Sequence, residues 1–483
     1  MGSAGRPWWQ RAVLYQVYVR SFADSDGDGV GDLRGIVDRL DYLHWLGVDA
    51  LWLSPVTVSP DKDWGYDVAD YTDVQPVFGG MAALDELVSE AGMRDMRVIV
   101  DIVPNHTSDR HPWFLDARSS RDSPHRDWYV WADPRPDGSA PNNWRSTFLG
   151  ASAWTFDEST GQYYLHNFLP EQPDLNWWND DVRAAFDDIL RFWLDRGIAG
   201  FRIDVAHGIV KDRELRDNPD PSISTYNANR DDVHEVLRRW RRVVDEYEPE
   251  RVLLGETWVM DLQRLARFYG SGDDELHLAF NFPFTFAELN AGRLRSIVET
   301  TQSVLPERAW PVWMLSNHDI ARFPTRMAGG DERKARALLF LLLTLRGTPV
   351  LYYGDELGMP QAEIPLGSER DMDGRDGART PLPLPLNGGW RNPWLPLTAR
   401  VSSVAQQRGD QASFLSYCRR LIAQRRANPD LVDGDYESIP SPDGVWAFRR
   451  GGRTRVAVNL TEEETELEDG SRLAPWQGLV QRR

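Results

Sequence analysis

The sequence predicts an α/β protein built on a closed barrel of eight parallel strands, the (β/α)8 or TIM barrel. Short apolar runs rich in β-branched residues alternate with amphipathic stretches of helical spacing, a pattern that is typical of repeated βα units. Several of these runs end in an acidic residue. Barrels of this class carry their chemistry at the carboxyl ends of their strands.

Eight apolar runs are predicted as the barrel strands, and they lie near 13–19, 49–53, 97–102, 200–204, 251–256, 277–282, 312–316 and 349–353. Helices are predicted between them, over Leu33–Leu46, Val182–Leu194, Asp232–Glu246 and Glu332–Leu345. In the first of these helices the apolar residues Ile36, Leu40 and Leu43 follow helical spacing, and Gly47 is the expected C-cap.

Two stretches interrupt this alternation. The long segment between the third and fourth strands is rich in Trp, Pro, Asn and Asp, and a structureless loop of that length is implausible. It is therefore predicted as an inserted domain on the catalytic face. From about residue 429, short alternating runs such as Gly444–Phe448 and Thr454–Asn459 predict an antiparallel β domain. The predicted division is barrel 1–104, inserted domain 105–172, barrel 173–428 and C-terminal β domain 429–483, with a long loop over 360–396.

Composition excludes several partners. The chain has 483 residues and a net charge of −19 without a basic cluster, which argues against a nucleic-acid partner. Its one cysteine, Cys418, excludes an internal disulfide framework. We find no secretory h-region and no run approaching the roughly 18 apolar residues of a membrane span. A cytoplasmic monomer without a membrane partner is the default expectation.

Two strand-end acids are candidates for catalysis. Asp204 ends the run Gly200–Ile203, and Arg202 lies two residues earlier on the same side of the pleat. A neighbouring positive charge lowers a carboxyl pKa and suits a nucleophile, although an ordinary ion pair is the alternative. Glu256 ends Val252–Gly255. A partly apolar setting would keep it protonated as a general acid, or it could cap the next helix.

A third acid, Asp319, follows Asn317 and His318 after the seventh strand. It could bind sugar hydroxyls and stabilise positive charge on a sugar ring, or it could serve as an N-cap. Asp101 ends the third strand, and His106 follows it either as a ligand-binding or as a structural histidine. Several acids that converge on one pocket are what cleavage of a glycosidic bond requires.

Together these motifs resemble the alpha-amylase family of glycoside hydrolases (family 13), within it the oligo-1,6-glucosidase and alpha-glucosidase branch. The matching stretches are Tyr15–Phe22, Gly65–Asp67, Asp101–His106, Gln172–Asn176, Gly200–Asp204, Gly255–Glu256 and Ser316–Asp319. The resemblance implies a retaining mechanism in which Asp204 is the nucleophile, Glu256 the general acid/base and Asp319 the group that holds the ring hydroxyls. It also implies a glucose subsite lined by Asp101, Arg202, His106 and His318, with Tyr66 beneath the ring.

The resemblance also bears on substrate length and linkage. Asp63 and Arg379 match a pair that closes the pocket on one terminal glucose, which implies an exo-acting enzyme. The Met-Gln-Trp ending that usually follows is replaced by Leu382–Pro385. Val205 resembles relatives that act on α-1,6 bonds. The next residues depart from the family pattern, and His207 is predicted to contact the second sugar.

A metal site is predicted in the loop Asp24–Asp32, where aspartates alternate with small residues. Gly29 fits the sixth position of an EF-hand, but Gly35 occupies the twelfth, which excludes a standard EF-hand. The resemblance implies a structural Ca²⁺ bound by the residues Asp24, Asp26, Asp28, Val30 (through its carbonyl) and Asp32. An Asp/Gly turn without an ion is the alternative.

The predicted function is therefore a retaining, exo-acting α-glucosidase that hydrolyses terminal α-1,6 or α-1,4 bonds of short oligosaccharides without an organic cofactor. The alternative is a relative with the same acids that transfers or isomerises the glucosyl unit, such as a transglucosidase, a sucrose- or trehalose-type isomerase or a phosphorylase. A non-catalytic binding module is disfavoured because all three acids are present.

Overall fold

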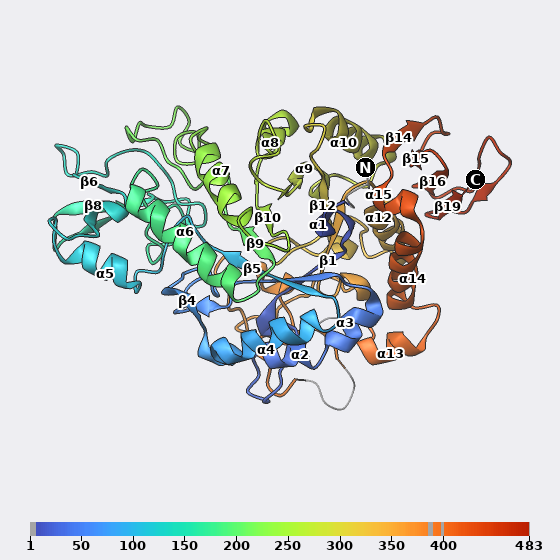
Figure 1. Ribbon diagram of the computed structural model, residues 1–483, viewed down its shortest axis with the longest axis horizontal. Coiled ribbons are helices and arrows are strands. Elements are labelled where there is room, and N and C mark those ends of the chain that lie inside the picture. The colour runs from blue at the N-terminus through green and yellow to red at the C-terminus, as the bar shows by residue number, and fades with distance from the viewer. Residues whose placement is uncertain (1–5, 385–389, 398–399, 483) are drawn as a thin grey trace.

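The computed structural model describes residues 6–384, 390–397 and 400–482. A parallel barrel forms the centre of the molecule, and helices surround it (Figure 1). A small β-containing insertion lies at one end of the long axis, and the C-terminal antiparallel sheet lies at the other. This arrangement confirms the predicted (β/α)8 fold with a C-terminal antiparallel β domain.

All eight predicted strands are present. They are β1 (Leu14–Val17), β2 (Ala50–Leu53), β5 (Arg97–Ile102), β9 (Gly200–Ile203), β10 (Val252–Gly255), β11 (Leu278–Ala279), β12 (Val312–Met314) and β13 (Thr348–Tyr352). They pair in parallel in the order β11-β10-β9-β5-β2-β1-β13-β12. A parallel bridge between Phe280 and Val312 joins the two ends of that order and closes the barrel.

Alternation along the strands decides which side chains enter the barrel. Leu14, Trp52, Ile99, Leu254 and Met314 belong to one buried cluster inside it. Their strand neighbours pack in the larger cluster that includes the surrounding helices. Side chains on a strand alternate with a period of two. Ile99 and Leu254 point into the barrel, so Asp101 and Glu256, each two residues further along, lie on the same inward side.

The surrounding helices follow the predicted amphipathic stretches closely. The helices up to the end of the barrel are α1 (Trp8–Arg11), α2 (Leu33–Val37), α3 (Leu40–Leu46), α4 (Gly80–Gly92), α5 (Pro112–Ser119), α6 (Asp180–Asp195), α7 (Val233–Val244), α8 (Leu262–Arg267), α9 (Phe282–Thr285), α10 (Ala291–Val304), α11 (Phe323–Arg326), α12 (Glu332–Thr344), α13 (Val404–Gly409) and α14 (Phe414–Ala427). Cys418 is buried on α14 as a free thiol.

The single helix predicted over Leu33–Leu46 is wrong in one respect, because the structure divides it into α2 and α3. The chain leaves helical geometry at Arg39, where φ is −113° and ψ is 4°. The buried residues Leu33, Ile36, Leu40 and Leu43 keep helical spacing across the break, so periodicity alone did not reveal it. Gly47 is the predicted C-cap, with φ of 102°.

The segment between β5 and β9 contains α5, the 3-10 helix η3 (Arg126–Trp128) and a three-stranded antiparallel sheet of order β6-β8-β7. Its strands are β6 (Trp131–Ala132), β7 (Trp154–Asp157) and β8 (Gln162–Leu165). Trp144, Trp154 and Leu165 form a separate small core. An antiparallel bridge between His106 and Asp174 ties the beginning of this segment to its end.

The C-terminal region begins with the short helix α15 (Pro429–Asp433), capped by Asn428, so its first residues are helical rather than β. The main sheet has the order β14-β15-β16-β19, with strands β14 (Tyr436–Ile439), β15 (Val445–Arg450), β16 (Thr454–Asn459) and β19 (Gly478–Arg482). A two-stranded sheet adds β17 (Thr465–Glu466) and β18 (Arg472–Leu473). The two runs singled out in the sequence correspond to β15 and β16.

The predicted long loop over 360–396 is irregular in its described part, apart from one 3-10 turn. Short 3-10 turns occur at η1 (Val19–Ser21), η2 (Pro76–Phe78), η4 (Asp355–Leu357) and η5 (Arg375–Ala378), and a two-stranded ribbon joins β3 (Thr57–Val58) to β4 (Asp70–Val74). Pro385, the last residue of the atypical Leu382–Pro385 stretch, lies outside the described residues. None of the helices within the described ranges is long and apolar enough to cross a membrane.

Candidate active site

A cavity of about 440 Å³ opens at the carboxyl ends of the barrel strands, and the three candidate catalytic acids Asp204, Glu256 and Asp319 line it. Of the predicted binding residues, Asp63, Tyr66, His106 and His207 also line the cavity. The residues Asp101, Arg202, His318 and Arg379 are fully or almost fully buried. They contact the lining residues, so they form the layer that supports the cavity wall.

The guanidinium of Arg202 organises the acids. Its Nη1 lies 2.7 Å from Asp204 Oδ1 and 2.8 Å from Asp101 Oδ1, and its Nη2 lies 2.9 Å from Glu256 Oε2. The bonds to the two aspartates have hydrogen-bond geometry. The Glu256 contact is close but lacks that alignment, since Nη2 has no hydrogen-bond partner. The aspartates are therefore the better partners for the positive charge.

Burial raises the pKa of Asp204 and of Glu256 above their usual values, and Arg202 opposes the rise. Burial also raises the pKa of Asp101 to about 7. The sequence led us to expect a lowered pKa for Asp204, so desolvation outweighs the arginine here. Three buried carboxyl groups around one cation cannot all ionise cheaply, and this crowding favours a protonated carboxyl group within the cluster.

Tyr66 connects this cluster to the third acid. Its hydroxyl lies 3.1 Å from Asp101 Oδ2 and 2.6 Å from His318 Nε2, and its ring stacks on the His318 ring at 5.2 Å. Gln16 Nε2 lies 2.9 Å from His318 Nδ1. When this amide donates, the imidazole proton is on Nε2, which faces Tyr66 and, at 3.2 Å, Asp319.

A different set of partners stabilises the ionised form of Asp319. Burial alone would raise its pKa, but His318, Arg375 and Arg379 lower it below the usual value. Burial lowers the pKa of His318 to about 3, so this ring is neutral at neutral pH. The permanent charges beside Asp319 are therefore the two arginines, each 3.1 Å from Oδ1.

The predicted pairing of Asp63 with Arg379 is wrong. Asp63 Oδ1 lies 2.7 Å from Arg375 Nη2, whereas Arg379 donates to Asp319 and, through Nε at 2.9 Å, to the carbonyl of His318. The two arginines stand four residues apart around the turn η5, and only Arg375 lines the cavity. Arg379 supports Asp319 from behind.

Two predicted histidines have defined places in the wall. His106 Nε2 lies 3.0 Å from the Tyr66 carbonyl and 2.9 Å from Gln172 Nε2. Burial lowers its pKa to about 4, and the same cause lowers the pKa of His207 to about 4. His207 Nδ1 lies 3.3 Å from the Glu256 carbonyl. Both rings are therefore neutral hydrogen-bonding groups at neutral pH.

Val205, the residue after Asp204, has a positive φ of 44°. A β-branched residue rarely adopts this conformation, which costs roughly 1–3 kcal/mol. The result is that its backbone N–H donates to Glu256 Oε2 at 2.9 Å. Strain beside one candidate catalytic acid therefore orients the other.

Sequence reasoning missed several lining residues, namely Asn105, Thr147, Phe148, Asn167, Phe168, Asn227, Trp258, Asp373 and Arg375. Asn105 and Trp258 lie inside or beside motifs that were recognised. Phe148, Phe168 and Asn227 come from irregular segments without a local pattern. Only their place in the folded chain reveals them.

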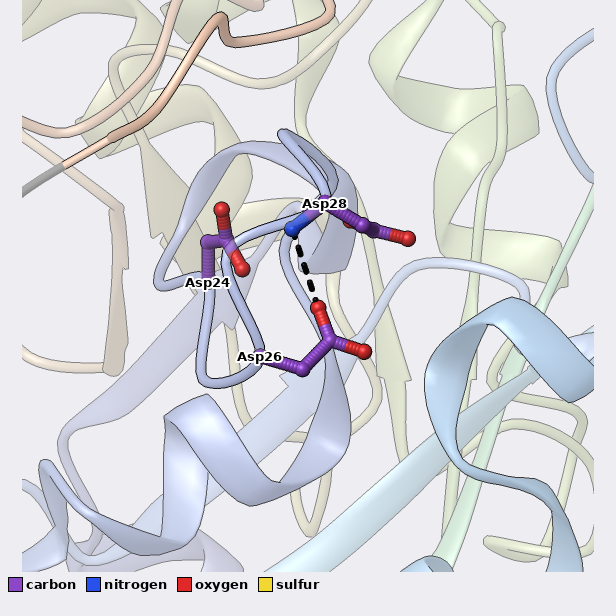
Figure 2. Close-up of side chains that lie close together, drawn as sticks. All are labelled: Asp24, Asp26 and Asp28. Atoms are coloured by element: carbon purple, nitrogen blue, oxygen red, sulfur yellow. Dashed lines mark hydrogen bonds between the residues drawn. The ribbon is translucent and has the colours of Figure 1, made fainter.

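The predicted metal loop folds partly as expected. Ligand atoms of Asp24, Asp26 and Asp28 lie within 4.8 Å of one another, and Figure 2 shows these side chains around one turn. The Asp32 carboxylate instead accepts bonds from Ser25 N and Gly35 N, both at 2.7 Å, and caps α2. Gly29 has a φ of 97°, and a Cβ there would lie 2.3 Å from the Asn392 carbonyl oxygen. The tight turn and its oxygen donors fit a hard cation.

Comparison with known proteins points to one family. The model of the family described as "Alpha amylase, catalytic domain" matches residues 16–434 of this chain. The chain is 42% identical to a probable alpha-glucosidase of Rhizobium meliloti (strain 1021), covering 98% of this chain and 93% of that protein. It is 36% identical to an oligo-1,6-glucosidase of Heyndrickxia coagulans, covering 95% and 93%. The solved structure of the alpha-glucosyl transfer enzyme XgtA superposes with a TM-score of 0.93 at 38% identity, covering 99% of both chains.

Proposed function

This chain belongs to the alpha-amylase family of glycoside hydrolases, and from that premise we propose that it is a retaining, exo-acting α-glucosidase. Its substrates would be short oligosaccharides with a terminal α-1,6- or α-1,4-linked glucose. The observation that carries the proposal is the contact of Asp204 and Glu256 with the same guanidinium at one end of the cavity. Two carboxyl groups so close together favour direct attack over attack by an interposed water.

Each acid has a role that its surroundings support. Asp204 Oδ attacks the anomeric carbon and forms a β-glucosyl ester, while the glycosidic bond breaks and its oxygen takes the proton of Glu256. Glu256 then removes a proton from water, which attacks the same carbon and frees Asp204. The proton of the resting cluster belongs on Glu256, because both aspartates receive better hydrogen bonds from Arg202.

The remaining polar groups support recognition of one glucose unit. Asp319, held ionised by Arg375 and Arg379, would bind the ring hydroxyls and stabilise the positive charge that develops at the anomeric centre. The ion pair between Asp63 and Arg375 stands at the cavity wall and would exclude a further sugar beyond the terminal one. An exo-acting enzyme needs such a closed end.

The rival function is transfer of the glucosyl unit to a sugar or another acceptor. It would use the same acids, and the likeness to an alpha-glucosyl transfer enzyme favours it. The partition between water and another acceptor depends on the mouth of the cavity, where Trp258 is 40% exposed. Product analysis with and without excess acceptor sugar separates the two functions.

The proposal predicts that the glucose released by hydrolysis appears first in its α-anomeric form. Isomaltose, maltose, sucrose, trehalose and soluble starch would be compared by chromatography and by proton NMR in the first minutes of reaction. Short substrates should release α-glucose, and starch should be cleaved slowly and only from its ends. The Asp204→Asn variant, which lacks the nucleophile, is the background control. Early β-glucose, or rapid internal cleavage of starch, would contradict the proposal.

We also propose that the loop Asp24–Asp32 binds a structural Ca²⁺, with the clustered carboxylates of Asp24, Asp26 and Asp28 as its side-chain ligands and the Val30 carbonyl as a main-chain ligand. Ca²⁺ at 100 times its dissociation constant should add about 2.7 kcal/mol of stability. Chelation should therefore lower the Tm, and added Ca²⁺ should restore it. The Asp26→Ala variant should not respond to either. An unchanged wild-type Tm after chelation would rule out the ion.

A further inference from the structure

We propose that Asp371 is a positioning residue of the active site, which sets the arginines that hold Asp63 and Asp319 in place. It makes no contact with the substrate in this role, and it lies outside the motifs that define the family resemblance. The inference rests on the proposed glucosidase function, and it extends that function to a residue behind the cavity wall.

The contacts of the Asp371 side chain connect both arginines. Oδ1 accepts from Arg375 Nη2 at 2.6 Å and Nε at 3.1 Å, and from Arg379 Nη1 at 3.2 Å. The outer nitrogens of the same arginines continue to Asp319 Oδ1, each at 3.1 Å, and Arg375 also reaches Asp63. Asp371 is therefore the anchor common to two guanidinium groups that converge on one carboxylate oxygen.

Asp371 also shapes the backbone that carries these arginines. Its Oδ2 accepts from the backbone N–H of Asp373 at 3.1 Å and of Arg375 at 2.9 Å. These bonds lead the chain through Gly374, with φ of 74°, into the turn η5 that contains Arg375 and precedes Arg379. One carboxylate thus orients both the turn and the side chains that leave it.

Charge balance explains why an acid is needed at this position. Arg375 and Arg379 are both buried, at 9% and 0% exposure, and two neighbouring guanidinium groups repel each other. Asp371, whose side chain is 1% exposed, places a negative charge between them. Without that charge, both arginines would compete for Asp319 and Asp63 alone. A shift of either guanidinium moves the carboxylate that grips the glucose.

The decisive variant is Asp371→Asn, which keeps the shape and removes the charge. We expect kcat to fall roughly 10- to 100-fold, as for other small displacements at a reacting centre, with a smaller change in KM. Asp376→Asn is the matched control. Asp376 lies buried in the same loop and accepts hydrogen bonds from the backbone N–H groups of Arg370 and Asp371, but its carboxylate bonds to neither guanidinium. It should retain most of the wild-type kcat.

A double-variant cycle distinguishes positioning from general loosening of the loop. If Asp371 acts through Asp319, adding Asp371→Asn to Asp319→Asn should cause little further loss in kcat with p-nitrophenyl α-glucoside. Calorimetric binding of 1-deoxynojirimycin should weaken in the Asp371→Asn variant and remain near wild type in Asp376→Asn. An equal loss in both backgrounds, or an equal loss in Asp376→Asn, would overturn the inference.

Failure of the proposed function has a different signature. A wild-type protein that releases no glucose from any short α-glucoside would refute the glucosidase proposal itself. An active wild type whose kcat and inhibitor affinity are unchanged by Asp371→Asn would refute only the positioning role.

Discussion

At the scale of single residues, the site buries more carboxyl groups than positively charged groups. Arg202 contacts three carboxyl groups, and burial raises the pKa of each of them. Such crowding destabilises the folded protein, because charge is desolvated without full compensation. It also keeps a proton available at a pH where an exposed glutamate would have lost it.

Replacing Glu256 with Gln should therefore have opposite effects on activity and stability. Loss of the proposed general acid should lower kcat about 10²- to 10⁴-fold and remove the alkaline limb of the pH profile. The Tm should rise at neutral pH, since the folded-state pKa of Glu256 is raised and the wild type loses stability as pH rises from the unfolded value toward it. Near pH 4 this gain should shrink. Activity assays and calorimetry across pH check both effects, and a lowered Tm at neutral pH would contradict the crowding explanation.

Sequence analysis identified residues at this scale where a motif placed them at a strand end. Asp204, Glu256 and Asp319 follow strands, and barrel geometry alone brings them to one cavity. The prediction of Arg379 as the partner of Asp63 was wrong because Arg375 lies in the same local stretch, and the two arginines differ only in which way the turn η5 directs them. No sequence pattern predicted a role for Asp371, because its partners become its neighbours only when the turn η5 forms.

At the scale of elements, one buried ion pair fastens the insertion to the barrel. Lys211 Nζ, in the chain after β9, lies 2.9 Å from Asp174 Oδ2 near the end of the insertion. Asp174 also accepts from Asn105 and Asn167, which line the cavity. Part of the cavity wall therefore depends on this pair.

Replacing only one partner of this ion pair should lower the stability of the protein more than replacing both partners. Lys211→Met leaves Asp174 buried without its cation and should cost about 3–5 kcal/mol of stability. The double variant Lys211→Met with Asp174→Asn should recover part of that loss. KM for isomaltose should rise in the single variant because Asn105, which lines the cavity, loses the hydrogen bond that it accepts from Lys211. Denaturant titration and steady-state kinetics test this, and an additive double variant would show that the pair is not coupled.

The strands and helices were predicted more accurately than the breaks within them. The eight strands were found because apolar runs of a single type recur between amphipathic helices. The break between α2 and α3 was not found, since the buried face continues through Arg39 and only the backbone angles change. The insertion was recognised by its length and composition, but its sheet order depends on long-range pairing that no local pattern reports.

At the scale of the whole molecule, one buried arginine joins the C-terminal sheet to the barrel, and a second buried arginine on α14 supports the same helix end. Arg450 on β15 donates to the Thr344 carbonyl at 2.6 Å, and Arg425 on α14 donates to the Leu343 and Leu345 carbonyls at 3.0 and 3.2 Å. These carbonyls belong to the end of α12, where free acceptors and the helix dipole favour cations. The sheet thus caps a barrel helix.

The variant Arg450→Met should lower stability without altering the site. Loss of the bond to the Thr344 carbonyl should cost about 1–3 kcal/mol of stability. KM and kcat on maltose should stay near wild type because β15 lies at the far end of the molecule from the insertion (Figure 1). Arg449→Met, at the neighbouring exposed position, is the control and should have little effect. A large change in KM would show that the sheet influences the cavity.

The Asp63–Arg375 pair has a consequence for how a chain would be shortened. A cavity closed at its inner end admits substrate and water through one opening, so the remainder of the substrate must leave before water can reach the glucosyl ester. Glucose then leaves last. The enzyme would therefore release its chain after every cut and could not advance along it, and a mixture of oligosaccharides would shorten together rather than one chain at a time.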